Sequence, residues 1–145
     1  MKETDKAWLA GIIDGEGSIF IMKQHRKDRE RDTNYILRVV VSSTDPYMAT
    51  ECHNLVGGPV ISEIRDDRKN NSNTLRWALN GKKASSFLVS ILPYLKVKMK
   101  QANLAIEFQN TTKKHYKHMK PIDYQRQQEF YLALKQAKLD LKIGK

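Results

Sequence analysis

Ten residues near the N-terminus, 8–17, constrain the fold of this chain more than any other segment. They read Trp-Leu-Ala-Gly-Ile-Ile-Asp-Gly-Glu-Gly, a short apolar helix that runs into an acidic, glycine-punctuated turn. Ala7, Gly11 and Gly15 recur at four-residue intervals, so one face of the helix carries almost no side chain. Such a face lets a second helix backbone approach closely. The segment therefore predicts a helix that packs tightly against another helix.

Two carboxylates, Asp14 and Glu16, follow at the C-terminal end of this helix. The helix dipole is negative there, so carboxylates are mildly unfavourable. Residues placed against a local preference are often functional. If two such helices pair, their carboxylates come together, and a divalent cation is needed to hold them.

The nonamer 9–17 resembles the LAGLIDADG motif of homing endonucleases. Residues 95–104, LKVKMKQANL, resemble the LKxKxxQAxL stretch of the small, single-motif branch of that family. Order and spacing also fit, so the resemblance covers most of residues 5–110. It implies an α+β fold of the αββαββα type, with a saddle-shaped antiparallel sheet in a homodimer. Read alone, the nonamer is also compatible with an Asp-Gly turn after an ordinary surface helix.

The 145 residues indicate a single domain, with a core over about 1–110 and a basic linker and C-terminal helix over about 111–145. No stretch is apolar enough to span a membrane, and the N-terminus lacks the apolar core of a secretory signal. Cys52 is the single cysteine, which excludes an internal disulfide and a cysteine-rich zinc site. An intracellular protein is expected; organelle, bacterium, archaeon and phage all stay open as the host compartment.

The net charge of +10 favours a polyanionic partner, although a merely basic surface is the alternative. Residues 1–80 hold 12 basic and 12 acidic side chains, whereas residues 81–145 hold 14 basic and 4 acidic ones. The whole excess therefore lies in the second part. A dimer would place this charge around one duplex, where release of counterions drives binding.

Hydrophobic periodicity and turn residues predict alternating helices and hairpins. The first expected elements are a helix over 5–14, capped by Thr4 or Asp5, and strands over 18–27 and 35–42. A helix over 46–56, opened by Asp45-Pro46, then leads to strands over 60–68 and 74–80 and to helices over 82–92 and 96–109. A last helix is capped by Asp123 and carries Phe130, Leu134, Ala137 and Leu141 on one face. In the second strand, the period of two assigns Tyr35, Leu37, Val39 and Val41 to the core. No internal repeat is present, and the motif occurs once.

The resemblance assigns the metal-binding carboxylate to Glu16, with the backbone carbonyl of Gly15 nearby. Mg²⁺ prefers oxygen ligands and keeps several waters, so one carboxylate per subunit plus DNA phosphate oxygens can suffice. Lys98 falls where the family has its active-site lysine, and an ammonium there can stabilise charge at the phosphate. The alternative for Lys98 is a solvated helix face.

Three further residues, Ser43, Gln101 and Asp14, are considered together with Glu16 and Lys98. Ser43 stands in the place of a water-positioning glutamine that close relatives often carry, and a basic residue expected in the next turn is replaced by Tyr47, Met48 or their neighbours. Gln101 is expected to order solvent or metal. Asp14 is expected to hold the helix end and the dimer interface rather than to carry the chemistry.

Base reading is expected from the polar face of the two hairpins, because a two-stranded ribbon fits the major groove. The candidate DNA-binding residues are Met22, Gln24, Arg26, Asn34, Arg38, Glu63, Arg65, Asp67 and Arg76, with Lys96 and Lys100 as phosphate contacts. A plain polar sheet face is the alternative. The candidate dimer interface comprises Ala7, Ala10, Gly11 and Asp14.

The resulting hypothesis is a homodimeric, Mg²⁺-dependent endonuclease that cuts both strands of a long, pseudo-palindromic DNA target and promotes intron mobility. Double-stranded DNA and a second copy of the chain are the expected partners, with no membrane and no small-molecule substrate. The alternative is a catalytically weak or inactive relative that binds DNA or RNA, such as an intron maturase or a regulator.

Overall fold

The computed structural model describes residues 1–25, 33–63, 74–111 and 120–143. Within these residues the chain alternates helices and antiparallel hairpins. The elements are α1 (Glu3–Glu16), β1 (Gly17–His25), β2 (Thr33–Ser43), α2 (Pro46–Val56), β3 (Val60–Glu63), β4 (Thr74–Asn80), α3 (Gly81–Ile91), the 3₁₀ turn η2 (Leu92–Tyr94), α4 (Met99–Thr111) and α5 (Pro121–Ile143). The predicted αββαββα order is therefore confirmed, followed by two C-terminal helices.

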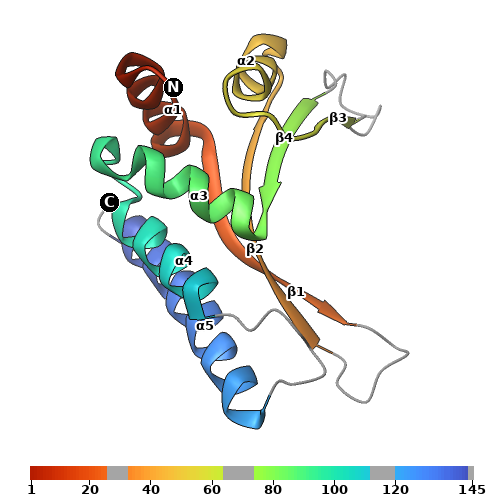
Figure 1. Cartoon of the computed structure of the whole chain (residues 1–145), viewed down its shortest axis with the longest axis vertical. Helices are drawn as coiled ribbons and strands as arrows, with labels where there is room; N and C mark the ends of the chain where they lie inside the picture. Colours follow the sequence, from red (N-terminus) through yellow and green to blue (C-terminus); the bar gives the residue numbers. More distant parts are fainter. Residues whose placement is uncertain (26–32, 64–73, 112–119, 144–145) are drawn as a thin grey trace.

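The four strands form one antiparallel sheet in the order β1-β2-β4-β3 (Figure 1). Gly17 pairs with Val41 at the start of β1, and Arg38 pairs with Asn80 where β2 meets β4. The described part of β1 thus forms an edge of the sheet. It begins directly at the C-terminal end of α1, so the end of that helix is fixed by the sheet register.

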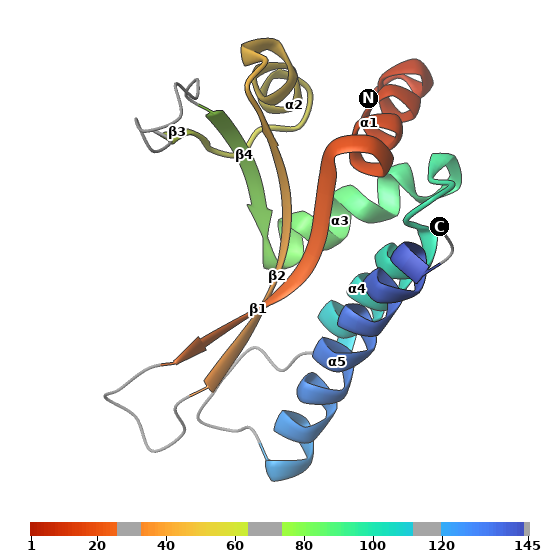
Figure 2. The same cartoon turned by 180° about the vertical axis from the view of Figure 1, so that it is seen from behind.

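One face of the sheet is covered by helices and forms the core. Tyr35, Leu37, Val39 and Val41 of β2 are all buried, as the period of two predicts. On β4, Trp77 is fully buried and meets the ring of Phe87 of α3 edge-on at 5.3 Å. Helices α4 and α5 lie side by side beyond β1 (Figure 2).

Helix α2 follows its sequence signals closely. The Asp45 carboxylate accepts a hydrogen bond from the backbone N–H of Tyr47 at 2.9 Å, and Pro46 occupies the first helical position. The helix ends at Gly57, whose φ of +89° strongly favours glycine. Both ends of this helix were correctly predicted because they depend on local chemistry alone.

Other helix boundaries differ from the prediction: α1 ends at Glu16 rather than at residue 14, and α3 spans Gly81–Ile91 rather than 82–92. The N-cap of α1 is Lys2, which makes no side-chain cap bond, rather than Thr4 or Asp5. Helix α4 begins at Met99, because the three preceding backbone N–H groups bind a carboxylate of α1. Asp123 lies inside α5, where its carboxylate accepts the backbone N–H of Lys120 at 2.9 Å.

The predicted core face of α5 is partly correct. Leu134 and Ala137 are buried, whereas Leu141 is 41% exposed. The predicted third strand is seen from Val60 to Glu63, and its remaining residues lie outside the described part of the chain. None of the helices in the described residues has the length and apolar character that crossing a bilayer requires.

Candidate active site at the end of α1

Glu16 is the last residue of α1, and its side chain is exposed. Gly17 follows and is buried between the helix and the sheet. A Cβ at Gly17 would lie 2.7 Å from the Cα of Ile13, so only glycine allows β1 to leave the helix this closely. Gly15 is also exposed beside Glu16. The close packing of Gly17 fixes the backbone from which the Glu16 carboxylate projects.

The ammonium group of Lys98 binds the backbone around Glu16. Its Nζ donates to the carbonyl oxygens of Ile13 (2.8 Å), Asp14 (3.2 Å) and Gly17 (2.7 Å). The carbonyls of Ile13 and Asp14 belong to the last turn of α1, the negative end of the helix dipole, where a cation is favourable. Burial lowers the pKa of Lys98, while the negative charges of Asp14 and Glu16 act in the opposite direction. The structure therefore brings Lys98 and Glu16 together across 82 residues of sequence.

Asp14 joins the same helix end to the start of α4. Its two carboxylate oxygens accept the backbone N–H groups of Lys96 (2.8 Å), Val97 (3.2 Å) and Lys98 (2.9 Å). These donors precede the first turn of α4, so the carboxylate acts as an anion at a helix N-terminus. Asp14 thus holds Lys98 at the end of α1, in keeping with the structural role expected for it.

Asp14→Asn is expected to lower the free energy of unfolding by about 2–3 kcal/mol, because it removes charge-assisted bonds to three backbone N–H groups. Glu16→Gln is the matched control, since the exposed Glu16 carboxylate lies two residues away at the same helix end. Urea unfolding of both variants tests this. Equal stability of Asp14→Asn and wild type would contradict the structural role of Asp14.

Ser43 and Gln101, the two predicted supporting residues, have other local roles. The Ser43 hydroxyl accepts the backbone N–H of Asp45 at 3.0 Å and so stabilises the turn into α2. Gln101 is 2% exposed in the first turn of α4, and its Oε1 has no hydrogen-bond partner within the described structure. In this conformation Gln101 belongs to the interior of the subunit and does not contact solvent.

The polar sheet face carries several predicted DNA-binding residues together. The register opposes Met22 to Ile36 and Gln24 to Asn34, and a guanidinium nitrogen of Arg38 lies 3.9 Å from the sulfur of Met22. Arg76 pairs with Ser42 on β2 and with Ile61 on β3, on the same face. Asn34 is a correction: it is only 6% exposed, so its amide is not offered to a groove in this conformation.

The remaining predicted contacts fall into two groups. The side chains of Lys96 and Lys100 are exposed, and the Lys100 ammonium lies 4.0 Å from the Asp140 carboxylate. Arg26, Arg65, Asp67 and the side chain of Glu63 lie outside the described residues.

Helix α1 presents a face of small residues to solvent. Ala7, Gly11 and Gly15 are exposed, and a Cβ built on either glycine meets no atom of the described residues within 4 Å beyond its chain neighbours and the adjoining helix backbone. Ala10 corrects the predicted interface, because it is fully buried in the subunit core and cannot contact a second copy. The helical repeat of 3.6 residues explains the difference: Ala10 lies on the same side as Leu9 and Ile13.

One cationic residue near the site was not predicted. Lys138 of α5 donates from Nζ to the Ser18 hydroxyl at 3.2 Å, two residues after Glu16. The lysine-rich character of residues 81–145 indicated anion binding in general. It did not indicate which lysine reaches the site, because α5 is brought to β1 only by tertiary packing.

Comparisons with known proteins agree with this architecture. A family model described as "LAGLIDADG endonuclease" matches residues 9–111. A comparison with curated proteins found no match.

Solved structures with a similar fold include the homing endonuclease I-CvuI in complex with its target, with a TM-score of 0.78, 21% identity, and coverage of 94% of this chain and 85% of that chain. An archaeal intron-encoded homing endonuclease, I-Vdi141I, complexed with DNA, gives a TM-score of 0.77 at 14% identity. The match covers 94% of this chain and 86% of that chain. The meganuclease I-SmaMI, bound to uncleaveable DNA, gives a TM-score of 0.66 at 15% identity. The match covers 87% of this chain but only 43% of the I-SmaMI chain.

Proposed function

Because this chain belongs to the LAGLIDADG endonuclease family, we propose that it is a homing endonuclease that cleaves both strands of a specific DNA target as a homodimer. The observation that carries this proposal is the geometry at the end of α1. The exposed Glu16 carboxylate projects from a backbone that Lys98 holds through three carbonyl oxygens. An acidic group fixed at a helix end, at the edge of a polar sheet face, suits hydrolysis of a phosphodiester bound along that face.

The donor set at this site suits a hard divalent cation. Glu16 offers carboxylate oxygens and Gly15 a backbone carbonyl, and both residues are exposed. Mg²⁺ takes oxygen ligands and retains waters, so phosphate oxygens of DNA would complete its shell. When bound, the ion would neutralise phosphate charge and lower the pKa of its water. The I-CvuI complex was obtained in the presence of 2 mM Ca, which supports a divalent ion in that relative.

The homodimer is proposed from chain length and from the face of α1. This chain covers most of I-CvuI and I-Vdi141I but under half of I-SmaMI. A protein with one motif supplies one carboxylate, so cutting two strands requires two copies. The exposed face formed by Ala7, Gly11 and Gly15 would let two α1 helices meet in an isologous contact. Asp14 would lie near the C-terminal end of this contact.

DNA recognition is assigned to the polar face of the sheet. The side chains of Met22, Gln24, Arg38 and Arg76 combine apolar, amide and guanidinium groups on adjacent strands. Arg pairs with guanine, Gln with adenine, and apolar groups meet the thymine methyl. Lys96 and Lys100 would contact phosphates and add affinity that does not depend on sequence.

A randomised plasmid library incubated with the protein and Mg²⁺ tests the proposal. Linear products whose ends share one sequence are the expected result, and the same protein with EDTA should give none. Tight retention of DNA without any cleavage would contradict the nuclease assignment. It would instead support a DNA- or RNA-binding relative, which the engagement of the Ser43 hydroxyl in the α2 turn already favours as the second candidate.

A further inference from the structure

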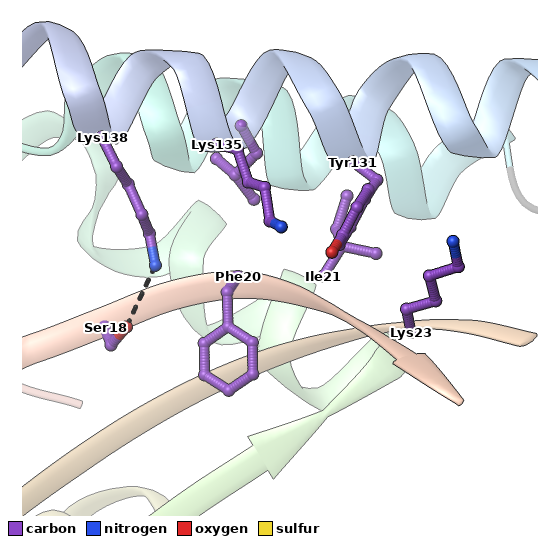
Figure 3. Close-up of a pocket in the computed structure, with 8 residues that line it drawn as sticks. Ser18, Phe20, Ile21, Lys23, Tyr131, Lys135 and Lys138 are labelled. Carbon is purple, nitrogen blue, oxygen red and sulfur yellow. Dashed lines mark hydrogen bonds between the residues drawn. The ribbon is translucent and has the colours of Figure 1, made fainter. Parts of the chain in front are cut away.

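A cleft of about 460 Å³ lies between the edge strand β1 and helix α5. Its lining residues come from only these two elements. They are Ser18, Phe20, Ile21 and Lys23 of β1, and Tyr131, Leu134, Lys135 and Lys138 of α5. Figure 3 shows the ammonium groups of Lys138, Lys135 and Lys23 arranged along the gap between helix and strand. The cleft begins at Ser18, two residues beyond the Glu16 carboxylate.

The cleft has an uncompensated positive charge. Three of its eight lining residues are lysines and none is acidic. Within the described part of the chain none of these lysines forms an ion pair; Lys135 and Lys138 instead lie near the rings of Tyr131 (4.6 Å) and Phe20 (5.3 Å). Burial lowers the pKa of Lys138, and the positive charges of Lys98 and Lys142 lower it further. An anion bound in the cleft would offset this repulsion.

Hydrogen bonding distinguishes Lys138 from Lys98. An ammonium group has three donors. Lys98 directs its donors to three backbone carbonyls, so in this conformation it holds the end of α1. Among the residues that the structure describes, Lys138 makes one hydrogen bond, to the Ser18 hydroxyl, and its aromatic neighbour Phe20 is not a hydrogen-bond acceptor of comparable strength. Lys138 therefore has donor capacity for an incoming anion.

We propose that the cleft between β1 and α5 binds a backbone phosphate of the DNA target, with Lys138 as its main ligand and Lys135 in support. This inference rests on the proposed endonuclease function and adds a contact to it. The phosphate is one that neighbours the scissile position, because Ser18 follows Glu16 by two residues and Lys138 is close enough to Lys98 for their charges to interact.

DNA is favoured over a free anion by the shape of the cleft. It runs along the edge of the sheet whose polar face carries Phe20, Arg38 and Arg76. A duplex lying on that face presents a phosphate about every 3.4 Å of axis on each strand, so its backbone would follow such an edge. A free phosphate would gain only the lysine contacts and none from the sheet.

The test measures the affinity of the full-length protein for a selected target at several salt concentrations, without cleavage, in Ca²⁺. Lys138→Met is expected to weaken binding about tenfold and to lower the slope of log K against log salt by about one per subunit. Lys138→Arg should restore the slope. Lys83→Met, on the exposed side of α3 away from the cleft, is the matched control and should leave affinity and slope unchanged.

A second arm locates the phosphate. Targets carrying one neutral methylphosphonate at successive positions around the cleavage site are compared in wild type and Lys138→Met. One position should weaken wild-type binding and have little further effect in the variant, because the two changes remove the same contact. Inorganic phosphate at the same ionic strength as chloride should not displace DNA selectively from the wild type.

The inference is overturned if Lys138→Met keeps the wild-type salt slope, or if its effect is the same for every methylphosphonate position. Selective displacement of DNA by inorganic phosphate would show a free-anion site instead. All three results are separate from failure of the proposed function, which would appear as absence of target selection and cleavage by the wild-type protein itself. Thermal unfolding of each variant excludes a folding defect as the cause.

Discussion

Glu16→Gln is expected to reduce DNA cleavage by at least about 10²–10³-fold while DNA affinity stays within a few-fold of wild type. The reason lies in where the carboxylate sits. It is exposed at the last residue of α1, beside carbonyls held by Lys98, and has no part in the subunit core. Glutamine preserves its size and removes only the charge that a divalent ion requires.

Two measurements are needed for this variant. Cleavage of the selected target is followed in Mg²⁺, and binding is followed in Ca²⁺ by gel retardation. Glu3→Gln is the matched control, because it makes the same change at the opposite end of α1, about 20 Å away for a helix of this length. Full cleavage activity in Glu16→Gln would remove the proposed metal role of this residue.

Gly11→Leu is expected to weaken dimer formation by about 10–100-fold or more, because a leucine in a closely packed helix contact costs about 1–3 kcal/mol. The subunit itself should tolerate the change. Apart from its chain neighbours and the adjoining backbone of α1, no atom of the described residues lies within 4 Å of a Cβ at Gly11, and the position is exposed. Replacing a mid-helix glycine also removes its propensity cost of about 0.5–1 kcal/mol. The variant should therefore fold as a monomer.

Sedimentation equilibrium, with circular dichroism on the same samples, checks this expectation. Glu51→Leu places the same side chain on the exposed side of α2 and should leave the oligomeric state unchanged. A Gly11→Leu protein that sediments as a stable dimer would show that the subunits do not meet through this face of α1. Loss of DNA cleavage together with the dimer is the accompanying expectation, since each subunit carries one Glu16.

These two variants separate chemistry from assembly. Glu16→Gln leaves the small face of α1 unchanged, and Gly11→Leu leaves the carboxylate and Lys98 unchanged. A mixture of the two proteins therefore has a clear expectation. If cleavage of both strands needs the Glu16 carboxylates of both subunits, adding Glu16→Gln to wild type should reduce double-strand cutting and increase nicking. Adding Gly11→Leu should do neither.

Much of the fold could be read from local sequence. The period of two in β2 identified its core residues, and Asp45, Pro46 and Gly57 marked both ends of α2. Such signals act between residues a few positions apart, so they do not depend on the rest of the fold. The motif at 9–17 likewise predicts Glu16 at the end of a helix, which is where α1 ends.

Signals that are partly local were misread. Ala10 was assigned to the dimer interface together with Gly11, but the core lies on the side of Leu9 and Ile13, and Ala10 is buried with them. Apolar residues alone predicted a start of α4 three residues too early. The start is delayed because Asp14, 82 residues away from Lys96, binds the N–H groups that would otherwise belong to the first turn.

The sequence by itself therefore determined the family, the order of elements and the acidic residue at the end of α1. Only the tertiary structure decided how Lys98 uses its hydrogen bonds, that Gln101 is interior, and that Lys138 reaches Ser18. The physical reason is separation along the chain. Lys98 lies about 80 residues from the Gly17 carbonyl that it binds, and Lys138 lies 120 residues from the Ser18 hydroxyl. These groups become partners only after the helices pack on the sheet and fix their distances.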